Sequence, residues 1–162
     1  MTGFRLGFLA GPKAVVEACA TVQGQITSCA SSLAQAAGLA ALALRDDDLA
    51  PLVAAMATKR DFVFSKLQAM PRVVVPRSAP SGAFYLLPEI DAFFARRSGD
   101  SGRSLSDSTV LCVALLAETG LALVPGDAFG APKSVRISYA ASMEELADAM
   151  ERLGGWLART TS

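Results

Sequence analysis

The sequence contains no histidine, and this absence excludes several kinds of chemistry. Ser-His-Asp and Cys-His nucleophilic sites need an imidazole as general base, and most zinc sites need one as a ligand. Any acid–base chemistry must therefore come from lysine, tyrosine or carboxylate side chains, or from a cofactor.

Cysteine is scarce, with Cys19, Cys29 and Cys112 as the three examples. The number is odd and the spacing matches no common metal site. We therefore expect reduced, mostly buried thiols in an intracellular compartment, and no metal site.

No excess of charge and no long apolar run is present. Fifteen basic and fifteen acidic side chains balance, and no basic tract stands out, so a nucleic-acid partner is not expected. Charges, glycines or prolines interrupt every apolar run before it reaches the roughly 20 residues of a membrane span. No signal peptide is recognisable, and the expectation is a soluble protein without a membrane partner.

The chain of 162 residues is 52% hydrophobic and 19% charged, which is typical of a globular protein with a core. Its hydrophobic periodicity predicts a strand, three helices, and then the order β-β-α-β-β-α. A polar loop of low complexity is expected over residues 96–106. The expected strands cover residues 4–9, 73–75, 82–88, 121–124 and 134–140, and the expected helices cover residues 12–26, 33–44, 47–69, 107–118 and 143–158.

The apolar run of residues 4–9 reads as a strand that is buried on both faces. Such a strand needs sheet neighbours, and nothing before it could supply one. Arg5 lies inside this run, where burial would be costly unless the guanidinium met an anion. The pattern suggests that the chain begins inside a domain of a longer protein.

The segment Ser134–Ala140 alternates, with Val135 and Ile137 facing one way and Arg136 the other. The neighbours of Arg136 on its own face are small. A guanidinium has a planar fork of donors that suits a carboxylate held by two parallel hydrogen bonds. Arg136 is therefore a candidate ligand for the carboxylate of an amino or oxo acid. The alternative is an arginine on the solvent face of a half-buried strand.

Four segments together resemble class I and II aminotransferases, which use pyridoxal phosphate and have fold type I. One such motif would be weak, but the four occur in the family's order and spacing, and they cover nearly the whole chain. The four segments are residues 1–12 (MTGFRLGFLAGP), 81–85 (SGAFY), 124–130 (VPGDAFG) and 135–140 (VRISYA). Within the family, three segments look most like one branch, the bacterial-type aspartate aminotransferases of plastids, which also act on prephenate with glutamate or aspartate as amino donor. They are residues 23–25 (QGQ), 27–32 (TSCASS) and 136–142 (RISYAAS).

The resemblance implies an α/β chain that forms the C-terminal part of a fold-type-I transferase. Residues 1–46 would be the tail of the large cofactor-binding domain and residues 47–70 a connecting helix. Residues 71–162 would be the small α+β domain, whose sheet is covered on one side by helices.

The resemblance also implies roles for individual residues. Arg136 falls where the family holds the substrate α-carboxylate, and Arg5 falls where an arginine neutralises the cofactor phosphate. Phe84 and Tyr85 would lie on the small-domain side of the cleft, with plain core aromatics as the alternative. Tyr139 is expected in the core.

One feature of the family is missing. The Schiff-base lysine lies eight residues before the arginine matched by Arg5, a position that precedes Met1, and no lysine of this chain replaces it. Met1 is then an internal methionine of a longer protein, and no catalytic residue is assigned here. The four lysines are Lys13, Lys59, Lys66 and Lys133.

Two functions follow from these expectations. The first is an aminotransferase of plastid or cytoplasm that moves an amino group between aspartate or glutamate and a 2-oxo acid, homodimeric as a full-length protein and inactive as this fragment. Its 2-oxo acids would be oxaloacetate, 2-oxoglutarate or prephenate. The second is a non-catalytic small domain that binds dicarboxylates or pairs with another subunit. The unpartnered first strand argues against the second function, because an exposed apolar strand promotes aggregation.

Overall fold

A computed structural model describes residues 1–161, which divide into two compact units. The first unit is Met1–Pro51, and the second begins at Leu52. Each unit is described by itself. The division expected from the sequence, at residues 46 and 70, remains a prediction.

The first unit is almost entirely helical. It contains the 3₁₀ turn η1 (Thr2–Phe4), the helices α1 (Lys13–Ile26) and α2 (Ser32–Leu42), and the first turn of α3 (Asp46–Gln68). The strand predicted over residues 4–9 is wrong. Arg5 closes η1 in a left-handed conformation with φ 50°, and residues 6–10 have no regular structure. An extended strand needs hydrogen-bonding neighbours, and without them a local turn satisfies the first backbone groups.

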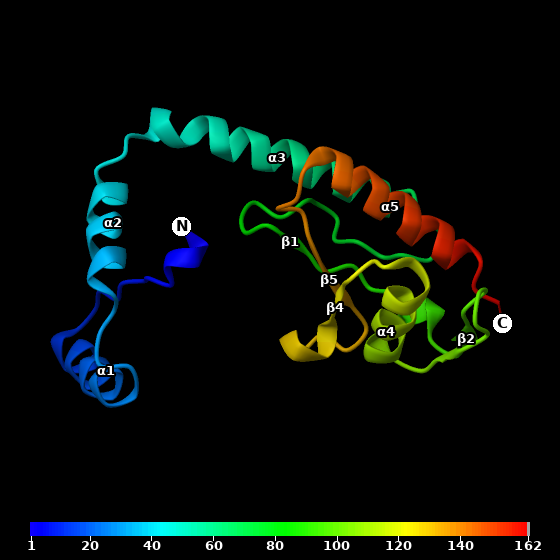
Figure 1. Ribbon diagram of the computed structural model, residues 1–162, viewed down its shortest axis with the longest axis horizontal. Coiled ribbons are helices and arrows are strands. Elements are labelled where there is room, and N and C mark those ends of the chain that lie inside the picture. Colours follow the sequence, from blue (N-terminus) through cyan, green and yellow to red (C-terminus); the bar gives the residue numbers. More distant parts are fainter. Residues whose placement is uncertain (162) are drawn as a thin grey trace. The chain divides into compact units, whose positions relative to one another are not determined.

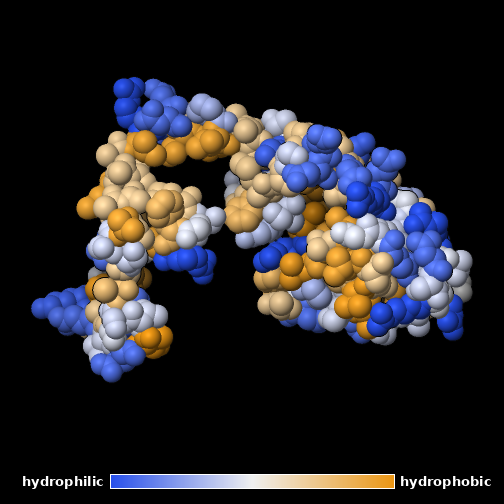
Figure 2. Space-filling model, in the orientation of Figure 1, coloured by the Kyte–Doolittle hydropathy of each residue, from blue (hydrophilic) through white to orange (hydrophobic). Residues whose placement is uncertain are grey.

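Apolar side chains in this unit are mostly exposed. Ala34 is its only buried residue among those described, whereas Leu33, Leu39 and Leu42 are more than 70% exposed. Figure 2 shows apolar surface over α2. The apolar side chains of α2 are therefore mostly unpacked within this unit, and Cys19 and Cys29 are exposed, contrary to the expectation of buried thiols.

The second unit combines helices with two small antiparallel sheets (Figure 1). The three-stranded sheet has the order β1-β5-β4, with Tyr85 opposite Ser138 and Val124 opposite Arg136. A separate hairpin pairs β2 with β3. The elements are β1 (Tyr85–Leu86), η2 (Asp91–Phe93), β2 (Arg96–Arg97), β3 (Ser104–Leu105), α4 (Ser108–Thr119), β4 (Val124–Pro125), η3 (Gly126–Phe129), β5 (Val135–Ser138) and α5 (Met143–Ala158).

The core of this unit lies against one face of β5. Val135, Ile137 and Tyr139 are at most 3% exposed, as their alternation predicts. Helices α3, α4 and α5 contribute to the same cluster, so the sheet is covered on one side by helices. The helical members of the cluster are Val63, Leu67, Leu111, Cys112, Ala114, Leu115, Leu146, Met150, Leu153, Trp156 and Leu157.

The helix ends follow the sequence signals closely. Asp107 accepts a hydrogen bond from the Val110 amide at 2.9 Å and begins α4. Gly120 ends α4 in a left-handed conformation with φ 72°. Ser142 and Glu145 form a capping box at the start of α5, the helix expected over residues 143–158.

The strands in this part of the chain are shorter than the sequence predicts. Residues 73–75 form no strand and make one isolated bridge, Val74 with Glu89, while the strand expected over 82–88 shortens to β1. Prolines at 76, 80 and 88 cannot donate to a ladder, and Ala83 has φ 62°, which interrupts extended structure.

The polar segment 96–106 is an anchored hairpin and not the mobile loop that its composition suggests. The Ser98 hydroxyl donates to Oε1 of Glu118 at 2.7 Å. Leu105 is fully buried in the core. Two points that are distant in sequence thus hold the hairpin, and composition alone cannot reveal them.

Candidate functional site

Arg136 lies in the middle of β5, between the buried side chains of Val135 and Ile137. Alternation along the strand turns it to the face opposite the core. The residue is half-buried. Strand β5 is central in its sheet, so the backbone of Arg136 is held on both sides.

Two aromatic rings cover the Arg136 guanidinium. Its central carbon lies 4.5 Å from the ring centroid of Tyr85 on β1 and 4.5 Å from that of Phe129 in η3. Stacking of this kind stabilises a guanidinium and limits its rotamers. No carboxylate of residues 1–161 forms an ion pair with Arg136, so its donors remain available to an external anion.

The turn that carries Phe129 is held by backbone contacts. The Gly126 amide donates to the Ser134 carbonyl at 2.8 Å, and the Gly126 carbonyl accepts from the Ala131 amide at 3.0 Å. A Cβ at position 126 would collide with the carbonyl oxygens of Ala131 and Ser134, so the turn requires glycine there. Phe129 therefore has a defined place beside Arg136.

A side-chain contact also ties this turn to α4. The buried hydroxyl of Ser108, in the first turn of α4, donates to Oδ2 of Asp127 at 2.9 Å. Residues 124–130 form one of the four segments that resemble the aminotransferase family, but the sequence predicts no role for Phe129. Its contact with Arg136 depends on the pairing of β4 with β5, which the sequence pattern does not specify.

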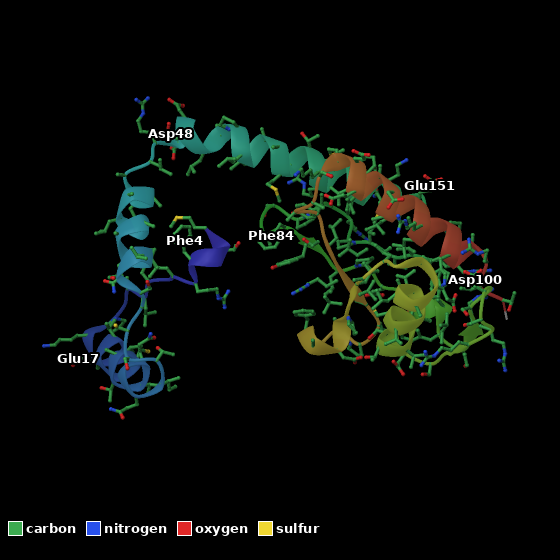
Figure 3. All side chains as sticks on the ribbon, viewed as in Figure 1. Phe4, Glu17, Asp48, Phe84, Asp100 and Glu151 are labelled. Carbon is green, nitrogen blue, oxygen red and sulfur yellow. The ribbon has the colours of Figure 1, made fainter. Side chains whose placement is uncertain are left out.

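The second ring belongs to Tyr85, the first residue of β1. Phe84 directly precedes β1 (Figure 3) and packs partly against the core. Its ring centroid lies 4.1 Å from that of Tyr85. Phe84 therefore fits the alternative of a core aromatic, whereas Tyr85 faces Arg136. Tyr139 is in the core, as expected, and its hydroxyl donates to the Ala83 carbonyl at 2.9 Å. Burial raises the pKa of the Tyr139 hydroxyl, so it remains a donor at neutral pH.

Arg5 belongs to the first unit, and Arg136 belongs to the second. The Arg5 side chain is exposed and takes part in no ion pair among the described residues. The roles of Arg136 as ligand of the substrate α-carboxylate and of Arg5 as partner of the cofactor phosphate both stay predictions.

Three of the four lysines are exposed, and the fourth, Lys59, is half-buried. Lys133 pairs with Asp91 at 3.0 Å, and Lys13 pairs with Glu17 at 3.6 Å. Lys66 lies 5.6 Å from the centroid of the Phe62 ring. Within residues 1–161 no cluster of carboxylate and cysteine side chains is arranged to hold a metal ion. None of the described helices combines the length and apolar character needed to cross a bilayer.

A sequence model of the family "Aminotransferase class I and II" matches residues 1–153. The chain belongs to this family. Members use pyridoxal phosphate as cofactor and act on amino and oxo acids. The resemblance stated from the four sequence motifs is thereby confirmed.

Relatives agree with the finer resemblance. The chain is 46% identical over 156 residues to an aspartate aminotransferase of Pinus pinaster, covering 94% of this chain and 31% of the relative. It is 41% identical to the bifunctional aspartate aminotransferase and glutamate/aspartate-prephenate aminotransferase of Petunia hybrida, covering 94% of this chain and 32% of the relative. The chain thus spans about a third of the length of these curated relatives.

The fold also has a solved counterpart. The crystal structure of an aspartate aminotransferase from Rhizobium meliloti superposes with a TM-score of 0.85 at 37% identity. The superposition covers 99% of this chain and 40% of that one. The helices and small antiparallel sheets agree with the fold class expected from the sequence, the C-terminal part of a fold-type-I transferase.

Proposed function

We propose that this chain is the carboxylate-binding part of a pyridoxal-phosphate-dependent aspartate-type aminotransferase, with Arg136 holding the substrate α-carboxylate. The substrates would be aspartate or glutamate and a 2-oxo acid such as oxaloacetate, 2-oxoglutarate or prephenate. The observation that carries the proposal is the contact of the Arg136 guanidinium with the rings of Tyr85 and Phe129, together with the lack of an ion-pair partner for Arg136 among residues 1–161.

The stacking leaves Arg136 suited to a carboxylate. The rings of Tyr85 and Phe129 each lie 4.5 Å from the central carbon of the guanidinium, and the N–H groups that the rings do not cover are left for a ligand. Two of those groups can donate parallel hydrogen bonds to the two oxygens of one carboxylate. The rings also reduce the access of water, which strengthens a charge-assisted pair.

The cofactor fits this chain only in part. Arg5 is an exposed charged side chain without an ion-pair partner among residues 1–161 and could neutralise a phosphate, but no lysine precedes it in the sequence. Pyridoxal phosphate, when bound, supplies an electron sink for the amino acid. The residues described here do not complete a site for it, and no reaction step is assigned to them beyond binding and orienting the carboxylate.

Assembly belongs to the same proposal. Members of the family are generally dimeric, and we propose that the complete protein also forms a homodimer. Size-exclusion chromatography with light scattering of that protein would reveal a mass of two chains.

Binding of L-aspartate to the chain tests the role of Arg136 directly. Side-chain Nε–Hε signals of ¹⁵N-labelled protein are recorded by nuclear magnetic resonance during a titration, and the Arg136→Lys variant assigns the relevant signal. We expect the Arg136 signal to move, and Arg136→Lys to weaken binding about tenfold or more, because a lysine cannot form the two-pronged pair.

Arg103→Lys is the matched control, because Arg103 is exposed in the hairpin and its side chain makes no ion pair among the described residues. It should bind L-aspartate as the unchanged chain does. An Arg136 signal that stays in place at saturating L-aspartate would refute the proposal. In an active enzyme that contains this chain, Arg136→Ala should lower kcat/KM for monocarboxylic and dicarboxylic substrates alike.

A further inference from the structure

The loop before β1 is fixed by side chains from two other elements. The Tyr139 hydroxyl, just beyond β5, donates to the Ala83 carbonyl at 2.9 Å. Nη1 of Arg60, on α3, donates to the Pro80 carbonyl at 3.1 Å. Both acceptors are backbone oxygens of the segment Pro80–Ala83, which has no regular secondary structure of its own.

Backbone geometry shows that this loop needs such support. Ala83 has φ 62°, a left-handed conformation that disfavours residues with a Cβ. A residue held there persists only where its surroundings impose the conformation. The hydroxyl of Tyr139 bonds the carbonyl of that very residue, and the Tyr139 amide bonds the next carbonyl, Phe84, at 3.0 Å.

Packing alone does not hold the loop. An open cavity of about 340 Å³ lies between the loop and α3, lined in part by Met56, Arg60, Ser81, Ala83 and Tyr139. A loop beside such a cavity has few apolar contacts on that side to resist displacement. The two side-chain hydrogen bonds are therefore a large part of what restrains it.

A displacement of this loop would also move the Tyr85 ring that contacts Arg136. Tyr85 follows the loop directly, and β1 pairs with β5 at only two positions. The ring that covers one face of the guanidinium is thus two residues away from the strained Ala83. Tyr139 itself faces the core and acts only through the loop.

We infer that Tyr139 is a positioning residue for carboxylate binding, with Arg60 as a second anchor. Its hydroxyl fixes the Ala83 carbonyl and thereby holds the Tyr85 ring against the Arg136 guanidinium. This inference rests on the proposed function only where it concerns the carboxylate. The placement of the ring is a property of the chain without ligand.

Tyr139→Phe tests the inference, because it removes the hydroxyl and keeps the ring in the core. The first measurement is the Arg136 Nε–Hε signal in the ligand-free chain, which a stacked ring shifts upfield. We expect this signal to move downfield in Tyr139→Phe, and to do so to a smaller extent in Arg60→Lys. The second measurement is L-aspartate affinity, which should fall about three- to tenfold, the loss typical of one buried hydrogen bond.

Ser98→Ala is the matched control, since it also removes one buried hydroxyl and its hydrogen bond, here to Glu118. It should destabilise the chain similarly but leave the Arg136 signal and the affinity unchanged. An unchanged ligand-free Arg136 signal in Tyr139→Phe would overturn the inference. The two proposals can fail separately. If the unchanged chain does not bind L-aspartate but Tyr139→Phe still shifts the Arg136 Nε–Hε signal of the ligand-free chain, the proposed function is wrong and the positioning role of Tyr139 stands.

Discussion

Nε1 of Trp156 on α5 donates a 2.7 Å hydrogen bond to Oε2 of Glu118 near the end of α4. The other oxygen of the same carboxylate accepts from Ser98 in the hairpin. One carboxylate therefore joins two helices and the hairpin. Trp156 is fully buried, and a donor left without an acceptor there would be costly.

Stability should depend on the charge of Glu118. Partial burial acts to raise its pKa, but hydrogen bonds from Ser101, Ser98 and Trp156 outweigh burial and leave the pKa below its usual value of 4.5. A carboxyl whose pKa is depressed by folding stabilises the folded state above its unfolded pKa and loses that contribution as pH falls through the folded value. We expect Glu118→Gln to lower the free energy of unfolding at pH 7 by about 1–3 kcal/mol.

Denaturant unfolding from pH 7 to pH 3 measures this effect. The difference between the unchanged chain and Glu118→Gln should shrink as pH falls below about 4.5, because the carboxyl itself becomes protonated. Glu151→Gln on the exposed side of α5 is the control and should show no comparable difference (Figure 3). If the difference in free energy of unfolding stayed constant down to pH 3, the charge of the Glu118 carboxylate would not be what stabilises the hairpin and the two helices.

How well the sequence predicts the fold depends on whether the signal is local. Ser142 with Glu145 and Gly120 are local signals, and they lie at helix ends that the sequence places at residues 143 and 118. The hairpin of residues 96–106 is not a local feature, because Glu118 and the end of α5 hold it. At its turn, Asp100 meets Arg159 at 3.0 Å (Figure 3). Composition therefore suggested a loop where the structure has order.

The candidate site shows the same limit. Alternation along β5 was enough to turn Arg136 away from the core, since it depends on neighbouring residues only. The contact with Phe129 depends on the turn between β4 and β5. The contact with Tyr85 depends on the pairing of Tyr85 with Ser138, which lies 53 positions further along the chain. The strand predicted over residues 4–9 failed for a different reason. It was inferred from a continuous apolar run, which the structure forms as the end of η1 and irregular backbone.

Gly126 should tolerate no larger residue. A Cβ there would meet backbone oxygens of Ala131 and Ser134, which cannot move like a flexible side chain. We expect Gly126→Ala to lower the free energy of unfolding by about 1–3 kcal/mol, and to displace Phe129 from Arg136. Gly130→Ala is a useful comparison, because it meets no atom but needs a left-handed conformation with φ 69°.

The comparison separates collision from conformational strain. Gly130→Ala should cost about 1 kcal/mol, the usual penalty for a Cβ in that region. Thermal and denaturant unfolding give the two stabilities, and the Arg136 Nε–Hε signal shows whether Phe129 has moved. Equal losses in the two variants would mean that the turn can relax around the added methyl group.

Phe129 should contribute to carboxylate affinity through its ring. Phe129→Leu keeps an apolar side chain but removes the aromatic face that lies 4.5 Å from the guanidinium carbon. We expect L-aspartate binding to weaken about two- to fivefold, equivalent to about 0.5–1 kcal/mol for a partly exposed cation–π contact. Phe129→Tyr retains the face and should bind like the unchanged chain. Weakening of the same size in both variants would assign the effect to shape and not to the ring.

Cys112 should be the one slow thiol among the three cysteines. Burial raises the pKa of Cys112 to about 11, whereas Cys19 and Cys29 are exposed. Only the thiolate reacts with iodoacetamide, and a pKa near 11 leaves about one thiol in a thousand ionised at pH 8. Intact mass spectrometry at pH 8 should therefore show two fast additions of a carbamidomethyl group.

The third addition should appear only when the second unit unfolds. In strong denaturant the surroundings of Cys112 are lost, its pKa returns toward the ordinary value, and all three thiols should react at similar rates. Peptide mapping after a short native reaction identifies the unmodified cysteine, and Cys112→Ala should remove the slow phase. Rapid native labelling of Cys112 would contradict its placement in the core formed by α4, α5 and β5.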